Sequence, residues 1–288
     1  MEKIAVHSGH FHADDVFAVA ILRLIYPKIK VIRTRDENKL KKVDARIDVG
    51  FKYDVKTNNF DHHQKEGAGK RANGIPYASA GLIWKHFGTK LVSEEVLNYI
   101  DERVIQFIDA ADNGVSTYTF EEVKPYTISD FVSDLNPQWP NQTDKLFDKY
   151  FNEAVSIVIR LLKIEIEGVD NSIKAKEKIR NEIRKSNGKY LVLSEYMPWK
   201  KVVIEESNLK FVIFHDKLED QWRVCAVPVS LNTFENRKNL PREWGGLAGA
   251  DLQRVTKVKD AQFCHKNLFI AVVSSKKCAI ELVELALK

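Results

Sequence analysis

Sulfur-containing residues are scarce in this sequence. Its 288 residues include three cysteines and two methionines, and Cys225, Cys264 and Cys278 form no Cys-x-x-Cys pair. An odd number of isolated cysteines argues against a framework of disulfide bonds. We therefore expect the protein in a reducing compartment, the cytoplasm.

Long apolar runs are also lacking. The apolar run from Val16 to Tyr26 is short and is interrupted by Arg23, whereas a membrane-spanning helix needs about 20 apolar residues. The first ten residues do not have the charged and then apolar pattern of a signal peptide. These absences predict a protein that has no membrane partner.

A strong excess of one charge is missing as well. Lys and Arg number 45 and Asp and Glu number 40, so the net charge is +5, with a pI near 8.9. This mild excess is compatible with a polyanionic substrate but is weak evidence for one. The 44% of hydrophobic and 30% of charged residues are typical of soluble globular proteins, and the length suffices for two domains.

The first part of the chain alternates short apolar segments with helical ones. Strands are predicted at 3–7, 30–35 and 45–50, and helices at 15–26, 78–87 and 93–111. This order is typical of an α/β fold, a parallel sheet with helices on both faces. Ligands of such sheets gather at the carboxyl ends of the strands. Asp14 or Asp15 is expected to cap the first helix.

A strongly helical stretch follows at about 142–187 and ends in alternating charges, which indicate a solvated helix before a turn at Asn187-Gly188. Further strands and a final helix at 276–287 predict a second, smaller α/β domain. We expect a catalytic domain at 1–165, a helical linker at 166–188 and a substrate-binding domain at 189–288.

Five of the eight histidines lie within the first 63 residues. Imidazole and carboxylate groups hold divalent metals. In "VHSGHFHADD", His12 and Asp14 are two residues apart, so an extended backbone points both the same way, and His7 converges from the strand end. Capping explains an acid here but not three histidines in six residues. We therefore favour metal ligands, with His10 as the alternative to His12.

Two further motifs add to this group. Asp48 in "DVG" ends a strand on the same edge as His7. In "FDHHQ", adjacent residues point in opposite directions, so His62 is predicted to bind metal and His63 to face the substrate. Asp61 is predicted to orient one of them.

"DAADNG" at 109–114 ends a helix and adds Asp112, whereas Asp109 is interpreted as a solvated acid at the helix end. The candidate ligands are His7, His12, Asp14, Asp48, His62 and Asp112. Six nitrogen and oxygen ligands exceed the needs of one tetrahedral zinc and suit two ions of manganese or magnesium that share a carboxylate. Such pairs, about 3.5–4 Å apart, serve in-line displacement at phosphorus.

The ordered motifs resemble the DHH phosphoesterase superfamily, which includes RecJ-type exonucleases. They are most similar to its melanocyte-proliferating-gene branch. The likeness rests on "FHADD", "VIRTRD", "IDVGFKYD", "FDHHQ", "SAGLIWKHFG", "IDAADNG", "LNPQW" and "WGGLAG". It covers most of the chain and implies a DHH-type first domain and a DHHA1-like second domain.

The resemblance also implies roles. Asp48 would bridge two divalent ions, Mn²⁺ in the first place and Mg²⁺ as the alternative. His7 and His12 would lie on one side of it, and the other side would hold Asp14, His62 and Asp112. His63 would contact the scissile phosphate.

Weaker signals point to substrate binding. Arg35 in "RTRD" is placed to reach a phosphate or to pair with Asp36 or Glu37. "PREWGGLAG" joins Arg242 to Gly245 and Gly246, whose backbone N–H groups are candidates for holding an anion.

The combined expectation is a two-metal-dependent phosphodiesterase, a 3′–5′ exonuclease acting on RNA or DNA ends or short oligonucleotides. One alternative is a pyrophosphatase or small-nucleotide phosphohydrolase. Another is a non-catalytic protein that binds metal or nucleic acid. The oligomeric state is left open, with a homo-oligomer as one alternative.

Overall fold

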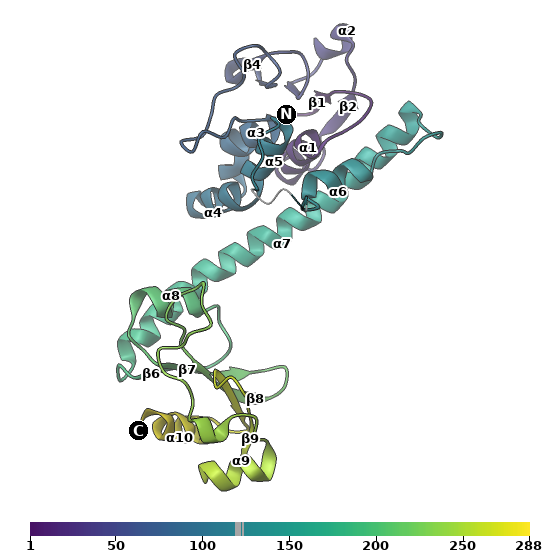
Figure 1. Cartoon of the computed structure of the whole chain (residues 1–288). Helices are drawn as coiled ribbons and strands as arrows, with labels where there is room; N and C mark the ends of the chain where they lie inside the picture. Colours follow the sequence, from purple (N-terminus) through teal and green to yellow (C-terminus); the bar gives the residue numbers. More distant parts are fainter. Residues whose placement is uncertain (119–121, 123) are drawn as a thin grey trace. The chain divides into compact units, whose positions relative to one another are not determined.

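The computed structural model describes residues 1–118, 122 and 124–288. Two compact units divide the chain, Met1–Val169 and Asp170–Lys288. Each contains one five-stranded sheet with helices packed against it (Figure 1). The division falls within the segment that we predicted as a linker.

Four parallel strands and one antiparallel strand form the sheet of the first unit, in the order β2-β1-β3-β5-β4. They are β1 (Lys3–Val6), β2 (Lys30–Arg33), β3 (Ala45–Ile47), β4 (Tyr53–Asp54) and β5 (Asn59–Phe60). Because β1, β3 and β5 are parallel neighbours, the residues that follow them meet at one edge. The short strands β4 and β5 were not predicted.

Helix α1 (Ala13–Ile25) is the central helix of this unit and is buried from Ala13 to Leu22. It packs against α3 (Ser79–Phe87) and α5 (Gln106–Asp112). The helix predicted at 93–111 is α4 (Glu94–Ile100) and α5, joined by a π-helical turn at Asp101–Ile105. Two short helices, α2 (Glu37–Leu40) and α6 (Ile128–Asp134), complete the unit.

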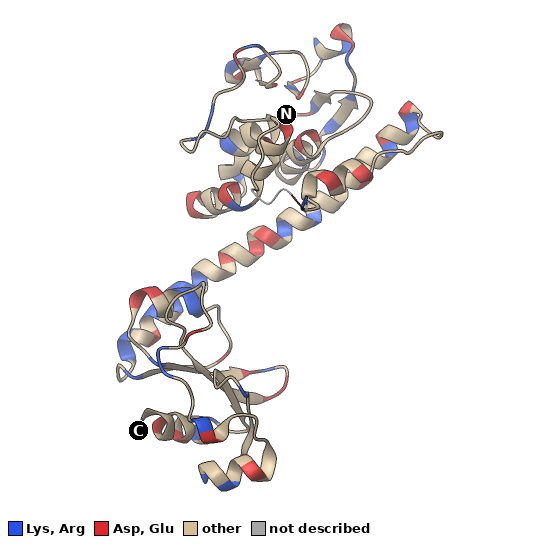
Figure 2. Ribbon diagram, in the orientation of Figure 1, with Lys and Arg blue, Asp and Glu red and all other residues tan. Residues whose placement is uncertain are grey.

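The long helix α7 (Asp144–Lys185) contributes to both units. Lys and Arg alternate with Asp and Glu along it, as Figure 2 shows. Its C-terminal part was predicted to be a solvated linker, but Ala175 and Ile179 are buried among Leu191, Trp199 and Phe214 of the second unit. Apolar residues at a helical spacing face that core while the charges remain outside. This segment is therefore also a packing element.

The sheet of the second unit has the order β6-β7-β8-β10-β9 and is parallel only between β6 and β7. Its strands are β6 (Tyr190–Leu193), β7 (Phe211–Asp216), β8 (Gln221–Ala226), β9 (Ala261–Cys264) and β10 (Ile270–Val273). Alternate residues of β7 belong to two different cores: Phe211 and Ile213 to one, Val212 and Phe214 to the other. Both faces of this sheet are therefore covered.

The helices of the second unit are α8 (Lys200–Glu206), α9 (Gly249–Thr256) and α10 (Lys276–Leu287). The final helix has the predicted bounds, whereas α8, α9 and β9 were not predicted. In the described part of the chain, no helix is long and apolar enough to cross a membrane.

Candidate metal centre

Strand ends bring the candidate ligands of the first unit together. His7 follows β1, Asp48 follows β3, and Asp61, His62 and His63 follow β5. Parallel pairing of β1, β3 and β5 places these residues along one edge.

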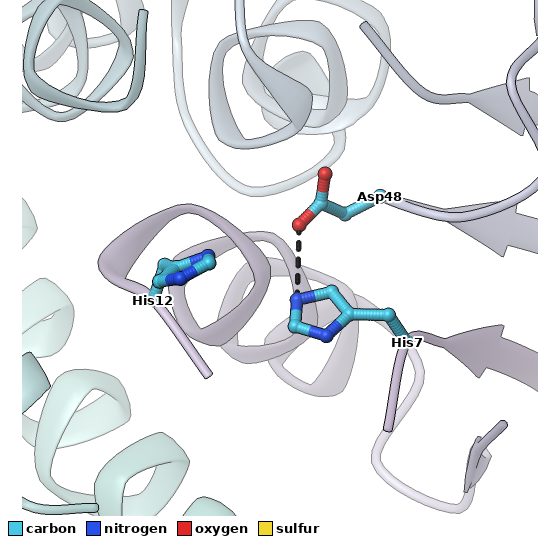
Figure 3. A group of neighbouring side chains, drawn as sticks. All are labelled: His7, His12 and Asp48. Atoms are coloured by element: carbon cyan, nitrogen blue, oxygen red, sulfur yellow. Dashed lines mark ion pairs between the residues drawn. The ribbon is translucent and has the colours of Figure 1, made fainter. Parts of the chain in front are cut away.

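The first group consists of His7, His12 and Asp48, whose ligand atoms all lie within 4.8 Å of one another. Figure 3 shows His7 and Asp48 extending from their strand ends toward each other, with His12 at the start of α1. The Nε2 atom of His7 lies 3.3 Å from Oδ2 of Asp48. The rings of His7 and His12 are 5.6 Å apart.

The second cluster centres on His62. Its Nε2 atom lies 2.9 Å from Oδ2 of Asp112, 3.6 Å from Oδ1 of Asp48 and 3.8 Å from Oδ2 of Asp14. Two groups here have ligand atoms that all lie within 4.8 Å of one another: Asp14 with His62 and Asp112, and Asp48 with His62 and His63. Asp48 therefore belongs to groups on both sides, and all six predicted ligands converge.

The N-terminus of α3 holds Asp14 in place. Backbone N–H groups of Ser79 and Ala80 donate to its two carboxylate oxygens at 3.0 and 2.5 Å. A carboxylate at a helix N-terminus satisfies N–H groups that have no partner within the helix and interacts favourably with the helix dipole. Asp14 thus reaches the centre from α1 with its position defined by a second helix.

A buried ion-pair network supports α3 and α5 from behind. Arg71 donates to both carboxylate oxygens of Asp101, at 2.7 and 2.6 Å, and to Oδ2 of Asp109 at 2.6 Å. Asp109 accepts the Gly81 N–H with its other oxygen at 2.9 Å. A side chain at Gly81 does not fit, because a Cβ would lie 1.8 Å from Oδ2 of Asp109.

This network corrects one interpretation. Asp109 was interpreted as a solvated acid at a helix end, but it is fully buried. It lies on α5 one turn before Asp112, so the Arg71 contact fixes the helix that presents Asp112. The sequence offered no local signal for Arg71, because the pair is 38 residues apart.

The ionisation of the centre follows from its crowded acids. Burial alone would lower the pKa of His7, but Asp15 and Asp48 outweigh it and raise the pKa to about 10. Burial would likewise lower the pKa of His62, but Asp112 and Asp48 raise it to about 11. For Asp14, burial and then the charges of Asp48 and Asp112 raise the pKa well above its ordinary value.

The pKa of Asp48 shifts the other way. Burial alone would raise it, but the neighbouring rings of His62 and His7 hold the pKa well below its ordinary value. Asp48 thus carries a full negative charge beside two imidazoles.

The residues fit divalent cations by a structural criterion. The Nε2 atoms of His7 and His62 are buried and form no hydrogen bond, although carboxylate oxygens lie close to both. Unsatisfied buried polar atoms are costly, and this cost would be relieved if each nitrogen donated its lone pair to a cation. Imidazole nitrogens and carboxylate oxygens are both ligands of divalent metal ions in proteins.

His12 rather than His10 joins the cluster. The exposed His10 packs on Phe147 of α7, with ring centroids 5.0 Å apart. The capping prediction needs correction, because His12 is the N-cap residue of α1 and neither Asp14 nor Asp15 is. Asp15 caps from the third helical position, where its Oδ1 accepts the His12 N–H at 2.9 Å. Its other oxygen lies 3.2 Å from Nε2 of His7.

The rings of His62 and His63 lie close together, with centroids 4.3 Å apart, so the prediction that the two side chains point in opposite directions is wrong. His63 also approaches Asp48, with its Nδ1 3.3 Å from Oδ1 of that residue. The side chain of His63 is 51% exposed, and its Nδ1 is 2.8 Å from Oδ1 of Asp61. Asp61 therefore orients His63 and leaves Nε2 for other contacts. The hydrogen bond to Asp61 raises the pKa of His63.

Arg35 lines a cavity of about 70 Å³ together with His7, His12, Asp48 and His63. Within the described part of the chain, its guanidinium forms no ion pair with Asp36 or Glu37. Its position at this cavity is compatible with phosphate binding.

The glycine turn of the second unit differs from the expectation. Gly245 and Gly246 follow a 3₁₀ turn at Arg242–Trp244. The Gly245 N–H donates to the carbonyl oxygen of Arg242, and the Gly246 N–H donates to that of Cys264. Both N–H groups already have backbone partners, which argues against the prediction that they hold an anion. The side chain of Arg242 is exposed.

Fold and site together define an α/β protein with a candidate centre for divalent cations at its strand ends. The chain belongs to the MYG1 family: residues 3–287 match MYG1_exonuc, described as "Uncharacterised protein family (UPF0160)". The MYG1 protein of Saccharomyces cerevisiae is 32% identical over 328 residues, covering 99% of this chain and 96% of the relative. The MYG1 protein of Dictyostelium discoideum is 31% identical over 310 residues, and the match covers 96% of this chain and 94% of the relative.

A human relative is named MYG1 exonuclease and is 30% identical over 323 residues. The match covers 99% of this chain and 85% of the human protein. Among solved structures, RecJ in complex with Mn²⁺ from Thermus thermophilus matches with a TM-score of 0.29 and 10% identity. The match covers 99% of this chain and 52% of the RecJ chain. That structural likeness is too weak to define the fold.

Proposed function

We propose that this protein is a two-metal-dependent phosphodiesterase that removes nucleotides from RNA or DNA ends or short oligonucleotides as a 3′–5′ exonuclease. The carrying observation is the position of Asp48, which belongs to ligand groups on both sides of the centre. The exonuclease name of mammalian relatives supports nucleic acid as the substrate.

In this proposal the centre would hold two Mn²⁺ ions, with Mg²⁺ as the alternative. Asp48 would contribute to both. His7 and His12 would hold one ion, and the other would be held by Asp14, His62 and Asp112. Such ions supply Lewis acidity and lower the pKa of bound water.

The remaining residues act on the phosphate. His63, with its Nδ1 bonded to Asp61, presents Nε2 to the solvent side. Its raised pKa favours the protonated ring, which donates a hydrogen bond to a non-bridging oxygen as negative charge develops there. Arg35, on the same cavity, would hold a neighbouring phosphate.

We assign catalysis to the first unit and propose that the second, as a DHHA1-like domain, contributes to substrate binding. The exposed Arg242 side chain is the contact that remains from the predicted glycine motif. Gly245 and Gly246 would serve by shaping the turn that presents Arg242.

Asp48→Asn tests the proposal directly. The protein is incubated with Mn²⁺ and single-stranded RNA or DNA labelled at the 5′ end, so that 3′–5′ removal appears as a ladder of shortened labelled products. We expect the variant to lose turnover and to bind less Mn²⁺ by calorimetry. Asp170→Asn, which changes an acid of α7 that pairs with Lys174 outside the centre, is the matched control.

The outcomes separate the alternatives. Full Mn²⁺-stimulated activity in Asp48→Asn would overturn the bridging role. Release of a labelled mononucleotide as the first product would reverse the polarity. Turnover of pyrophosphate alone would favour the pyrophosphatase alternative, and Mn²⁺ binding without hydrolysis of any of these substrates would favour a non-catalytic binding protein.

A further inference from the structure

Phe51 combines exposure with an unusual backbone conformation. Its side chain is 71% exposed, and its φ angle of 51° lies in the left-handed region. A bulky residue is rarely found there, because its Cβ approaches the backbone carbonyl. Where such strain persists, the surroundings enforce it, and this is characteristic of functional sites.

The enforcing contact comes from Asp61. The Phe51 N–H donates to Oδ2 of Asp61 at 2.7 Å, while Oδ1 of Asp61 accepts from the backbone N–H of His63 at 3.1 Å and lies 2.8 Å from Nδ1 of its ring. One carboxylate thus holds both residues. The rings of Phe51 and His63 lie edge to face, with centroids 6.4 Å apart and an interplanar angle of 72°.

The adjoining cavity is small. Its volume is about 70 Å³, which suits a group of the size of a phosphate. We therefore expect a planar base attached to that phosphate to lie outside it. Phe51 lines this cavity and presents an exposed aromatic ring at its rim.

We propose that Phe51 is the stacking platform for the nucleobase next to the scissile phosphate. The inference rests on the proposed function and deepens it, because it assigns single-stranded nucleic-acid ends as the substrate class. Every base has a face that stacks on an aromatic ring, so the contact selects for an unpaired base with little preference for sequence. The Asp61 bridge places this base at a constant distance from His63.

The kinetic test compares Phe51→Ala with Phe51→Trp on two substrates. One is a single-stranded oligonucleotide, and the other has the same length but abasic nucleotides at both ends. We expect Phe51→Ala to raise KM for the intact strand about tenfold, with kcat within about twofold, and to leave KM for the abasic strand unchanged. Phe51→Trp should retain the wild-type KM.

Equal losses on both strands, or no change on either, would overturn the proposal. Tyr99→Ala, which removes another exposed ring of the first unit, should change neither substrate and controls for a general surface effect. Phe51→Gly reports on the fold: it removes the ring and relieves the strained φ, so its Tm should equal or exceed that of the wild type while its KM follows Phe51→Ala.

A binding measurement keeps the inference testable if the protein hydrolyses neither strand, a result that would count against the proposed function alone. With Mn²⁺ present, calorimetry would compare AMP with ribose 5-phosphate, which lacks the base. We expect Phe51→Ala to weaken AMP binding about tenfold and to leave ribose 5-phosphate unaffected. Unchanged AMP affinity would refute base stacking at Phe51.

Discussion

The strand-end cluster of the first unit and the glycine turn of the second both carried chemical signals in the sequence, but they use their polar groups differently. Nε2 of His7 and Nε2 of His62 are buried beside carboxylate oxygens without forming hydrogen bonds of good geometry. The N–H groups of Gly245 and Gly246, in contrast, already donate to backbone carbonyls. A site prepared for a ligand keeps polar atoms uncommitted, whereas a structural turn satisfies its own.

The largest expected effect follows from removing a shared ligand. Asp48→Asn should lower Mn²⁺-dependent turnover by roughly a thousandfold or more, because two-metal catalysis contributes several kcal/mol. Steady-state rates over a Mn²⁺ titration measure this, with Asp170→Asn as control. If excess Mn²⁺ fully restored the turnover of the variant, Asp48 would contribute only to the affinity for Mn²⁺.

Removing Arg71 should have a large effect on stability. Arg71→Ala leaves the buried Asp109 without its cation, and breaking a buried pair costs about 3–5 kcal/mol. Urea unfolding would measure the change in the free energy of unfolding. Adding Asp109→Asn should recover part of the loss, because the amide replaces a buried acid that has lost its partner. Simple additivity of the two changes would contradict the coupling.

The pH dependence of the stability of the metal-free protein sharpens the comparison further. His7 and His62 have pKa values raised from 6.5 to about 10 and 11. A group whose folded pKa is raised stabilises the fold below its unfolded pKa, and the stabilisation is lost as pH rises through the folded value. Tm in EDTA should therefore fall between about pH 6.5 and 11.

The affinity for Mn²⁺ should depend on pH in the opposite direction to the Tm in EDTA. Because Mn²⁺ requires deprotonated imidazoles, its affinity should increase with pH. Differential scanning calorimetry with and without Mn²⁺ measures both trends. A replacement of both rings, His7→Gln with His62→Gln, provides the control and should flatten the dependence seen in EDTA. An unchanged slope in this variant would assign it to other groups.

The smallest effect is expected at the glycine turn. Gly246 has a φ angle of 78°, so Gly246→Ala should strain the turn and lower stability by about 1 kcal/mol. Its N–H would remain, and KM for oligonucleotides should stay within about twofold of the wild-type value. A large increase in KM without a loss of Tm would restore the turn as a substrate contact.

The sequence alone determined which residues meet at the strand ends. Short apolar segments before His7 and Asp48 predict parallel strands, and parallel strands align their carboxyl ends. This conclusion depends on local periodicity, which a single sequence carries. The side-chain alternation did not separate His62 from His63, whose rings lie 4.3 Å apart and differ in exposure instead, at 6% and 51%.

Only the tertiary structure decided which polar groups remain uncommitted. It showed Asp109 buried against Arg71, Phe51 tied to Asp61, and the N–H groups of Gly245 and Gly246 already satisfied. Each of these facts depends on a partner that no local pattern identifies, because hydrogen-bond satisfaction is a property of the folded neighbourhood. The sequence therefore predicted the candidate ligands, and packing determined which groups are available to act.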